Sequence, residues 1–198
     1  MRKTRAETMA ETRRRLLDAA ARAFARAGYG ETSVRDIANA AGLTTGALYA
    51  HFPGKEDLFL VLLEERYQTK IDELTRLVAE SSTVSDSLDA FSGRFSRLRD
   101  IEGDADLLAT EFWLYAARRP PVRRKLARLY RRLHEGIADL IASHPDLPAG
   151  TDASRLATLL IALGDGLGIQ ARIDPSSARR GLLGDVIREF LAACVEAR

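Results

Sequence analysis

Residues 32–55 read TSVRDIANAAGLTTGALYAHFPGK, and this stretch decides the fold because two short helices meet in it at a tight turn. Thr32 or Ser33 can accept hydrogen bonds from the first free N–H groups and cap a helix that runs to about Ala41. Gly42 follows, at a corner where glycine supplies backbone freedom. The stretch is therefore predicted to begin with a short capped helix and a sharp turn.

A second short helix follows the turn. Thr44 caps it, its predicted span is Thr45 to about His51, and Pro53–Gly54 breaks the chain after it. Apolar residues fall where both short helices would share a small core with a preceding helix: Val34, Ile37, Ala38, Leu43, Leu48 and Phe52. Two short helices at a steep angle, with the second able to enter a major groove, form the helix-turn-helix pattern.

The exposed residues of this stretch suit double-stranded DNA. Hydroxyl residues stand at both helix starts, where backbone N–H groups and the helix dipole favour phosphate. Small residues permit close approach to the groove, and the methyl groups of alanine and threonine can contact thymine. The candidate DNA-binding residues are Thr32, Ser33, Arg35, Thr44, Thr45, Gly46, Ala47, Tyr49, His51 and Lys55.

Several of these residues also have a purely structural interpretation. Tyr49 can be a half-buried core residue, His51 a capping or surface histidine, and Lys55 a solvated lysine in the first turn of a helix. Two short helices around a glycine also occur in helical proteins that do not bind DNA. The pattern alone therefore favours DNA binding and leaves the individual contacts open.

The charge distribution supports an anionic partner for the start of the chain. Residues 1–55 carry 10 of the 30 Lys/Arg residues and 5 of the 28 Asp/Glu residues, so their net charge is 10 − 5 = +5. The remainder carries 20 and 23, a net charge of −3, and the two parts sum to the overall +2. A basic first quarter on a slightly acidic remainder is typical of a nucleic-acid-binding arm.

The rest of the chain is also predicted to be helical, with about nine helices in an all-α fold and no strand or internal repeat. The other expected helices are Ala10–Ala27, a long helix from Lys55, Asp86–Arg99, Asp106–Arg119, Val122–Ser143, Asp152–Ile173 and Ser177–Glu196. Gly28 is expected to end the first of these helices.

Several classes of protein are disfavoured. Cys194 is the single cysteine, so no intrachain disulfide is expected, and no charge-free apolar run approaches a membrane span. The polar N-terminus lacks the apolar stretch of a signal peptide, so we expect a cytoplasmic protein. The three histidines show no metal spacing and no serine lies in a nucleophile-elbow pattern, so neither a metal, a cofactor nor an enzymatic activity is predicted.

Residues 10–60 resemble the N-terminal domain of the TetR family of bacterial regulators. The resemblance rests on the run LLDAAARAFARAGYGETSVRDIANAAGLTTGALYAHFPGKEDLF. It implies a DNA-binding domain over 1–55, a helical ligand-binding and dimerisation domain over 56–198, and a homodimeric repressor released from a palindromic operator by a small effector. By matching position, Thr44, Thr45 and Ala47 would face bases, while Thr32, Tyr49, His51 and Lys55 would hold phosphates. The chain departs from the common family pattern at Thr45 and Ala50, which leaves the operator sequence open.

In such a protein the last two helices would form the dimer interface. The candidate residues are Leu160, Leu163, Gly164, Leu167, Gly168, Leu183, Val186, Ile187 and Phe190. Gly164, Gly166 and Gly168 lower helix propensity by roughly 1 kcal/mol each relative to alanine, a cost that close helix crossing at an interface could offset.

A ligand pocket would be lined from the middle helices and would suit an apolar, aromatic effector. The candidates are Phe91, Phe95, Glu111, Phe112, Trp113, Tyr115, Tyr130 and His134, with Leu133 and Asp165 beside them, and each can equally be a plain core residue. Arg118 to Arg132 includes eight basic residues, for which a solvated helix face is the favoured interpretation.

Two further interpretations stay open at this point. A DNA-binding regulator without a ligand, controlled by a partner or constitutive, would share the N-terminal features. A helical interaction protein that does not bind DNA would account for the helices, but not for the basic first quarter or the TetR-like run.

Overall fold

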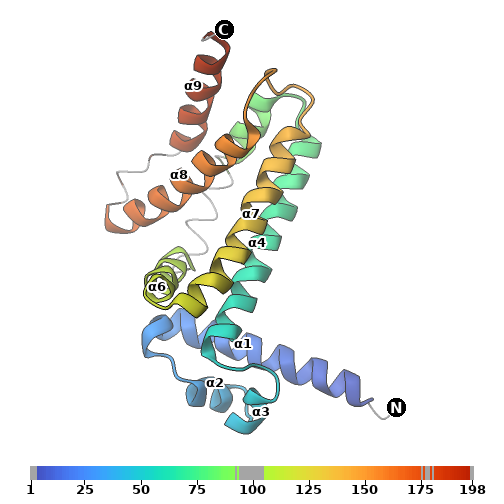
Figure 1. The fold of residues 1–198 in the computed structure, drawn as a ribbon, viewed down its shortest axis with the longest axis vertical. Helices are drawn as coiled ribbons and strands as arrows, with labels where there is room; N and C mark the ends of the chain where they lie inside the picture. The colour runs from blue at the N-terminus through green and yellow to red at the C-terminus, as the bar shows by residue number, and fades with distance from the viewer. Residues whose placement is uncertain are drawn as a thin grey trace. The chain divides into compact units, whose positions relative to one another are not determined.

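The computed structural model describes residues 4–91, 93, 105–174, 176, 179 and 181–196, and within these residues every regular element is a helix (Figure 1). The helices are α1 (Arg5–Glu31), α2 (Val34–Ala40), α3 (Thr45–Tyr49), α4 (Lys55–Glu80), α6 (Ala105–Ala117), α7 (Pro120–Ala142), α8 (Ala153–Ile173) and α9 (Leu182–Glu196). Residues 84–91 are helical as well, and the later part of the helix expected over 86–99 lies outside the described residues. The all-α prediction is confirmed.

The chain packs into two compact units. The N-terminal unit comprises residues 1–66 and 107–126, and the C-terminal unit comprises residues 67–106 and 127–198. Helices α4 and α7 contribute residues to both units. This division of the chain is defined by packing, and it places most of α6 in the N-terminal unit. The boundary between a DNA-binding and a ligand-binding domain after residue 55 stays a prediction.

Three helix starts differ from the sequence expectation. Helix α9 begins at Leu182 and not at Ser177, because Arg179 is not helical and Gly181, with a φ of 86°, forms a turn before the helix. Helix α1 begins at Arg5, before the first apolar residues, because Thr4 and Glu7 form a capping box in which each side chain bonds the other's backbone N–H. The Thr-x-x-Glu spacing was the signal for this start. Helix α7 begins at Pro120, because a proline in the first turn of a helix forfeits no intrahelical hydrogen bond.

The N-terminal unit is built around α1. Leu16, Leu17 and Phe24 of α1 are buried, and so are Ile37 of α2 and Leu48 of α3. The other expected core residues follow this pattern: Ala38 and Phe52 are buried, while Val34 and Leu43 are half-buried.

The turn between α2 and α3 is held from α1. Gly42 has a φ of 64°, the left-handed conformation that the corner requires. The Arg15 guanidinium donates a hydrogen bond to the carbonyl oxygen of Ala41 at 2.7 Å, the residue just before this glycine. The geometry of the helix-turn-helix therefore depends on a basic residue of the preceding helix.

A break near the end of α1 positions Tyr29. Gly28 has φ 76° and ψ 171°, so the regular helix breaks there as expected, but helical residues continue to Glu31 where a turn was predicted. The Tyr29 N–H, turned away from α1 by this break, donates to Glu111 Oε2 of α6 at 2.8 Å. A Cβ atom on Gly28 would lie 2.9 Å from the same carboxylate oxygen.

Replacing Gly28 with alanine is expected to lower the free energy of unfolding by about 2 kcal/mol, because positive φ strains an L-residue and the new methyl group displaces Glu111. Thermal unfolding measures this loss. Gly30→Ala is the matched control, because a Cβ atom there meets nothing within 4 Å and its φ is not positive. Equal melting temperatures for the two variants would contradict the argument.

The C-terminal unit has its own core. A buried cluster joins residues 84–91 to α8 and α9 through Leu88, Leu156, Leu183, Ile187 and Leu191. In this unit α4 and α7 run side by side (Figure 1), and a Cβ atom on Gly136 of α7 would lie 2.9 Å from Ile71 Cδ1 of α4. Glycine at this position therefore permits the close approach of the two helices.

Candidate DNA-reading surface and effector cavity

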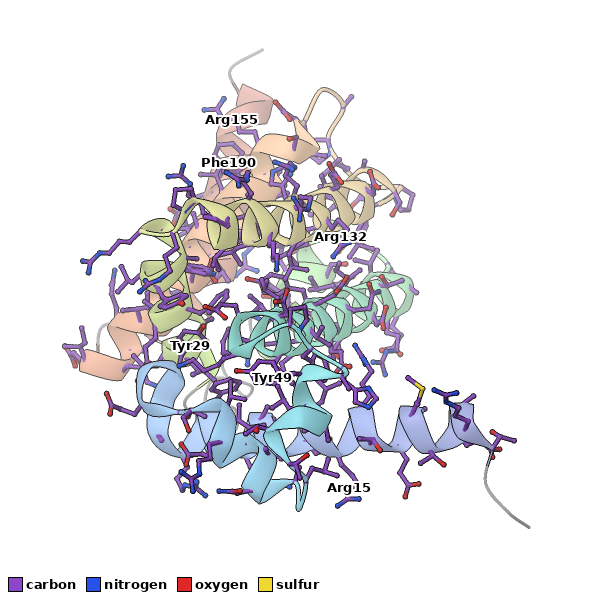
Figure 2. The ribbon with its side chains drawn as sticks, turned by 60° about the horizontal axis from the view of Figure 1, so that its bottom comes forward. Arg15, Tyr29, Tyr49, Arg132, Arg155 and Phe190 are labelled. Atoms are coloured by element: carbon purple, nitrogen blue, oxygen red, sulfur yellow. The ribbon has the colours of Figure 1, made fainter. Side chains whose placement is uncertain are left out.

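Helix α3 presents its polar side to solvent. Thr44 caps the helix by accepting a hydrogen bond from the Ala47 N–H at 3.1 Å, so its side chain is fixed at the helix start. Thr45 and Gly46 are exposed, Ala47 is half-buried, and the Tyr49 side chain is 57% exposed. Figure 2 shows Tyr49 on α3 and Arg15 on α1. The alternative in which Tyr49 is a half-buried core residue is wrong, because its side chain is exposed and the neighbouring Leu48 is the buried residue.

The start of α2 is a second exposed helix N-terminus. Ser33 caps it in a capping box with Asp36, whose carboxylate accepts from the Ser33 N–H at 3.0 Å and from its hydroxyl at 2.6 Å. These two hydrogen bonds hold the pKa of the Asp36 carboxyl below its usual value. Arg35 is exposed beside this cap, and His51, after α3, is half-buried.

Thr32 and Lys55, expected at the phosphates, direct their side chains inward. The Thr32 hydroxyl is buried and donates to the carbonyl oxygen of Gly28 at 2.7 Å. The Lys55 ammonium donates to the carbonyl oxygens of Tyr29 at 2.8 Å, Thr32 at 2.8 Å and Gly30 at 3.3 Å. It also lies 4.4 Å from the centre of the Tyr29 ring. The Lys55 ammonium thus makes three hydrogen bonds to backbone carbonyl oxygens at the end of α1.

Burial lowers the pKa of Lys55 below its ordinary value, while Glu56 and Glu31 oppose that shift. A lysine usually places its charge in water, so an ammonium held by backbone carbonyls indicates a structural role for this side chain. The sequence pattern gave Lys55 a first-turn position but not the direction of its side chain, which depends on where the end of α1 lies.

An aromatic cluster ties the end of α1 to α4 and α6. The rings of Tyr29 and Phe112 meet edge-to-face with centroids 4.9 Å apart, and those of Phe59 and Phe112 stack at 4.4 Å. The Tyr115 hydroxyl donates to Glu56 Oε1 at 2.5 Å. That hydrogen bond lowers the pKa of the Glu56 carboxyl, and burial raises the pKa of Tyr115.

Tyr115→Phe is expected to destabilise the protein by about 1–2 kcal/mol at neutral pH, because Glu56 loses its hydrogen-bond donor. The folded pKa of Glu56 lies below the unfolded value, so this contribution is present above about pH 5 and is lost as pH falls through the folded pKa. The stability difference between variant and wild type should therefore shrink in acid, as measured by urea unfolding at several pH values. Tyr49→Phe, on an exposed tyrosine, should show no such trend.

The C-terminal unit contains a partly open cavity of about 190 Å³. Its walls are mainly apolar and come from α4, residues 84–91, α7, the loop after α7, α8 and α9. The polar side chains among the lining are few: Tyr67, Lys70, Glu73, Ser87, His144 and Asp165. A largely apolar cavity with a few polar groups is typical of a small-molecule site.

The expected pocket residues divide between the two units. Phe91 and Leu133 line the cavity, and Phe95 lies outside the described residues. Glu111, Phe112, Trp113 and Tyr115 belong to the N-terminal unit and do not line it. Glu111, Phe112 and Tyr115 contact Tyr29 at the end of α1, and the pocket role expected for the four residues stays a prediction.

Tyr130 and His134 also lie outside the lining. The Tyr130 hydroxyl donates to Asp165 Oδ2 at 3.2 Å, and Asp165 is a residue of the cavity wall. Burial raises the pKa of Tyr130. His134 Nε2 lies 2.9 Å from Thr158 Oγ1 and 3.0 Å from the Ser154 carbonyl oxygen, so this histidine bridges α7 to α8.

Sequence reasoning missed the wall formed by α4 and by the loop after α7. Tyr67, Leu74 and Val78 have the same apolar spacing as ordinary core residues, so no signal in the sequence distinguishes them. His144 lies in a loop, and its burial could not be inferred from its neighbours in sequence.

The residues expected at a dimer interface differ in how far their own chain buries them. Leu183 and Ile187 are buried in the core of their own unit, and Leu160 and Gly164 line the cavity. Gly168 is buried within the chain. Leu163, Leu167 and Phe190 are partly buried against the core, and Val186 is half-buried. Arg155 of α8 lies 5.7 Å from the centre of the Phe190 ring of α9 (Figure 2).

A helix-turn-helix with an exposed second helix, followed by a helical unit with an apolar cavity, defines a DNA-binding regulator with a ligand-binding C-terminal domain. The family model of bacterial regulatory proteins of the tetR family matches residues 16–62, and that of the BetI-type transcriptional repressor C-terminal domain matches residues 104–196. These two matches cover the reading helices and most of the C-terminal unit.

Whole-chain relatives agree with these matches. The HTH-type transcriptional regulator TtgR of Pseudomonas putida is 30% identical over 198 residues, which cover 94% of this chain and 90% of the relative. The repressor KstR2 of Mycolicibacterium smegmatis is 32% identical over 140 residues, 66% of this chain and 67% of the relative. A putative TetR-family regulator from Mesorhizobium loti has the same fold, with a TM-score of 0.73, 24% identity, and coverage of 97% and 98% of the two chains.

The chain belongs to the TetR family of bacterial transcriptional regulators. Its family and relatives are regulators and not enzymes, and TetR-family regulators bind DNA operators and small effectors and act as dimers. Such regulators are soluble cytoplasmic proteins. Helix α8 is long and apolar enough to span a membrane, but core helices of soluble proteins pass that test too. No metal-binding group of side chains occurs among the described residues.

Proposed function

We propose that this protein is a cytoplasmic homodimeric repressor that reads a palindromic operator and releases it when a small, largely apolar ligand occupies the cavity. The observation that carries the proposal is the pairing, in one chain, of an exposed reading helix with an apolar cavity of about 190 Å³ in the other unit. A solid C-terminal core would instead have favoured a regulator without a ligand.

Residues 44–51 would enter the major groove. Thr44, Thr45 and Ala47 would face base edges, where threonine hydroxyls and methyl groups read base identity. Tyr49, His51 and Ser33, together with the N–H groups at the starts of the helices, would hold phosphates and set the position of the reading helix. Because the Lys55 ammonium bonds three carbonyl oxygens, we propose that Lys55 acts by fixing α1 against α4, and that only its backbone N–H faces the phosphates.

The dimer would form through the outer faces of α8 and α9. Leu183 and Ile187 face the chain's own core and Phe190 packs against it, so the partner would meet the flank of α9 on which Val186 lies half-buried. In a two-fold symmetric contact each residue near the axis meets its own copy or a close neighbour. Half-sites would then lie about one helical turn of DNA apart, roughly 34–36 Å, or somewhat more.

Val186→Glu is expected to dissociate this dimer at micromolar concentration, because two carboxylates would be buried near the symmetry axis. Sedimentation velocity measures the change in mass. Ala79→Glu places the same side chain on an exposed site of α4 and is expected to remain dimeric. A Val186→Glu protein that stays dimeric would place the interface elsewhere.

Ligand and DNA would oppose each other through the helices shared by both units. Helix α4 contributes Tyr67, Leu74 and Val78 to the cavity and starts at Lys55 in the N-terminal unit, and α7 is shared in the same way. A ligand that favours one setting of these helices would misalign the two reading heads of the dimer. By linkage, DNA must then lower the affinity of the protein for the ligand by the same factor by which the ligand lowers its affinity for DNA.

The experiment that tests the proposal selects bound sequences from a pool of random duplex DNA at moderate salt. An enriched palindrome, bound by two chains, supports a sequence-specific dimer and leads to its genes and to candidate effectors. If only weak, salt-sensitive and sequence-independent binding is found, operator recognition by this reading helix is wrong. If a compound binds the cavity but leaves operator affinity unchanged, the release step is wrong.

A further inference from the structure

Two of the six polar side chains of the cavity wall lie within hydrogen-bond distance of each other. Ser87, on the helical residues 84–91, and His144, in the loop after α7, both line the cavity, and Ser87 Oγ lies 3.3 Å from His144 Nε2. The His144 side chain is buried, with 7% of its surface exposed. Around the pair the wall is apolar, with Val84, Leu88 and Ile141 among the lining residues.

The hydrogen bonds of His144 fix which ring nitrogen carries the proton. The Asp146 N–H donates to His144 Nδ1 at 3.2 Å, so Nδ1 is unprotonated and a neutral ring carries its proton on Nε2. Nε2–H therefore donates to Ser87 Oγ. The backbone of His144 is held as well, because its N–H donates to the Ile141 carbonyl oxygen at 3.1 Å.

This arrangement gives Ser87 one defined role. Its oxygen accepts from His144, and within the described part of the chain its hydroxyl hydrogen has no acceptor. Ser87 is half-buried, and a hydroxyl donor in an apolar wall gains a hydrogen bond from a ligand that offers an acceptor oxygen. The hydrogen bond from His144 fixes the position of the Ser87 oxygen and leaves the hydroxyl hydrogen for the ligand.

The charged groups of the lining argue against an anion. Asp165 and Glu73 are acidic and Lys70 is basic, so acidic side chains outnumber basic ones in the lining. A carboxylate ligand would meet this acidic excess in an apolar cavity, where the loss of hydration is costly. A neutral carbonyl compound avoids that cost and still accepts the Ser87 hydrogen bond.

We propose that Ser87, held by His144, selects neutral, mainly apolar ligands that carry one acceptor oxygen, with an aryl ketone as the representative class. The proposal rests on the proposed function only in that the cavity is the effector site. Cavities of comparable size, on the order of 150 Å³, take up single aromatic rings, so ligands of one or two fused rings fit its scale.

The test uses four probes with one naphthalene skeleton on the full-length protein. 2-Acetylnaphthalene supplies the acceptor oxygen, and 2-isopropenylnaphthalene has nearly the same shape without it. 2-Naphthoate is the anion, and 1-(2-naphthyl)ethylamine is the cation. Isothermal titration calorimetry of wild-type protein should show the ketone binding about fivefold to tenfold tighter than the alkene, the preference that one neutral hydrogen bond gives.

Three variants assign the preference to Ser87. Ser87→Ala should reduce the ketone-to-alkene ratio to about one, and Ser87→Thr, which keeps the hydroxyl, should retain it. Val84→Ala removes apolar wall and should weaken both probes alike, leaving the ratio unchanged. Thermal unfolding of each variant checks that the protein is folded, and the ratio of two probes on the same variant cancels a general loss of affinity.

The outcomes separate this inference from the proposed function. A ketone that binds no better than the alkene, a carboxylate or ammonium that binds tighter than the ketone, or four probes that do not bind at all would overturn the inference. Release of operator DNA by all bound probes, without a ketone preference, would overturn the inference and leave the proposed repressor standing. A ketone preference lost in Ser87→Ala, with no effect on operator affinity, would support the inference and refute release by ligand.

Discussion

Lys55→Ala is expected to be the most destabilising single substitution among the polar residues of the N-terminal unit. The variant loses three hydrogen bonds from a charged donor to the carbonyl oxygens of Tyr29, Gly30 and Thr32, together with the ring contact to Tyr29. Hydrogen bonds to charged groups are worth about 1.5–3 kcal/mol each, and partial exposure reduces their sum. We expect a loss of about 3 kcal/mol and a melting temperature lower by roughly 6–12 °C.

Lys125→Ala is the matched control, because this lysine pairs with Asp57 in the same unit but at the surface. Exposed ion pairs contribute about 0–1 kcal/mol, so the control should melt within about 3 °C of wild type. The salt dependence of DNA binding, measured below the melting temperature of the variant, gives a second readout. It should be unchanged in Lys55→Ala, whereas a lysine that neutralises a phosphate would lower the slope by about 1. If Lys55→Ala lowers the slope of the salt dependence and leaves stability unchanged, Lys55 contacts a phosphate and its structural role is wrong.

Thr45→Glu is expected to abolish operator binding while leaving the protein folded. Thr45 is exposed at the first position of α3, where a carboxylate interacts favourably with the helix dipole, so stability should be unchanged or slightly raised. In the complex the same carboxylate would face the base edges and phosphates of the major groove. Juxtaposed like charges at an interface cost several kcal/mol, so we expect more than about 100-fold weaker binding to the selected operator.

Leu114→Glu adds the same charge to an exposed residue of α6 in the same unit, where the leucine side chain is 62% exposed. It should bind the operator within about twofold of wild type, because its charge is not in the groove. Fluorescence anisotropy with labelled operator measures both variants, and circular dichroism compares their melting. Retention of wild-type affinity by Thr45→Glu would mean that α3 is not the reading helix.

The N-terminal helices could be predicted in detail because their signals are local. Capping by Ser33 and Thr44, the glycine at the corner and the apolar residues of the two short helices are all readable from neighbours in sequence. The capping box of Thr4 and Glu7 also indicates the start of α1 at Arg5. The predicted start was later because the periodic apolar residues of this helix begin only after Ala10. The first proline of α7 was ambiguous, because proline both ends helices and begins them.

The pocket could not be predicted to the same extent. Phe112 and Tyr115 have the residue types of a ligand wall, yet they pack against Tyr29, which is 83 or more residues away in sequence. Tyr67, Ser87 and His144 have no local signal and line the cavity only because α4, residues 84–91 and the loop after α7 meet. Composition identifies which side chains can line a pocket, but it does not say which of two cores each side chain enters.

The sequence by itself determined the all-helical class, the helix-turn-helix, the exposed character of Thr45 and the family, because each depends on residues within a few helical turns of one another. Only the tertiary structure decided that Lys55 turns inward, that α6 belongs with the DNA-reading helices, that Leu183 and Ile187 face their own core, and that Ser87 meets His144. These outcomes depend on contacts between distant segments, whose geometry is set by how the helices pack and not by the pattern along any one of them.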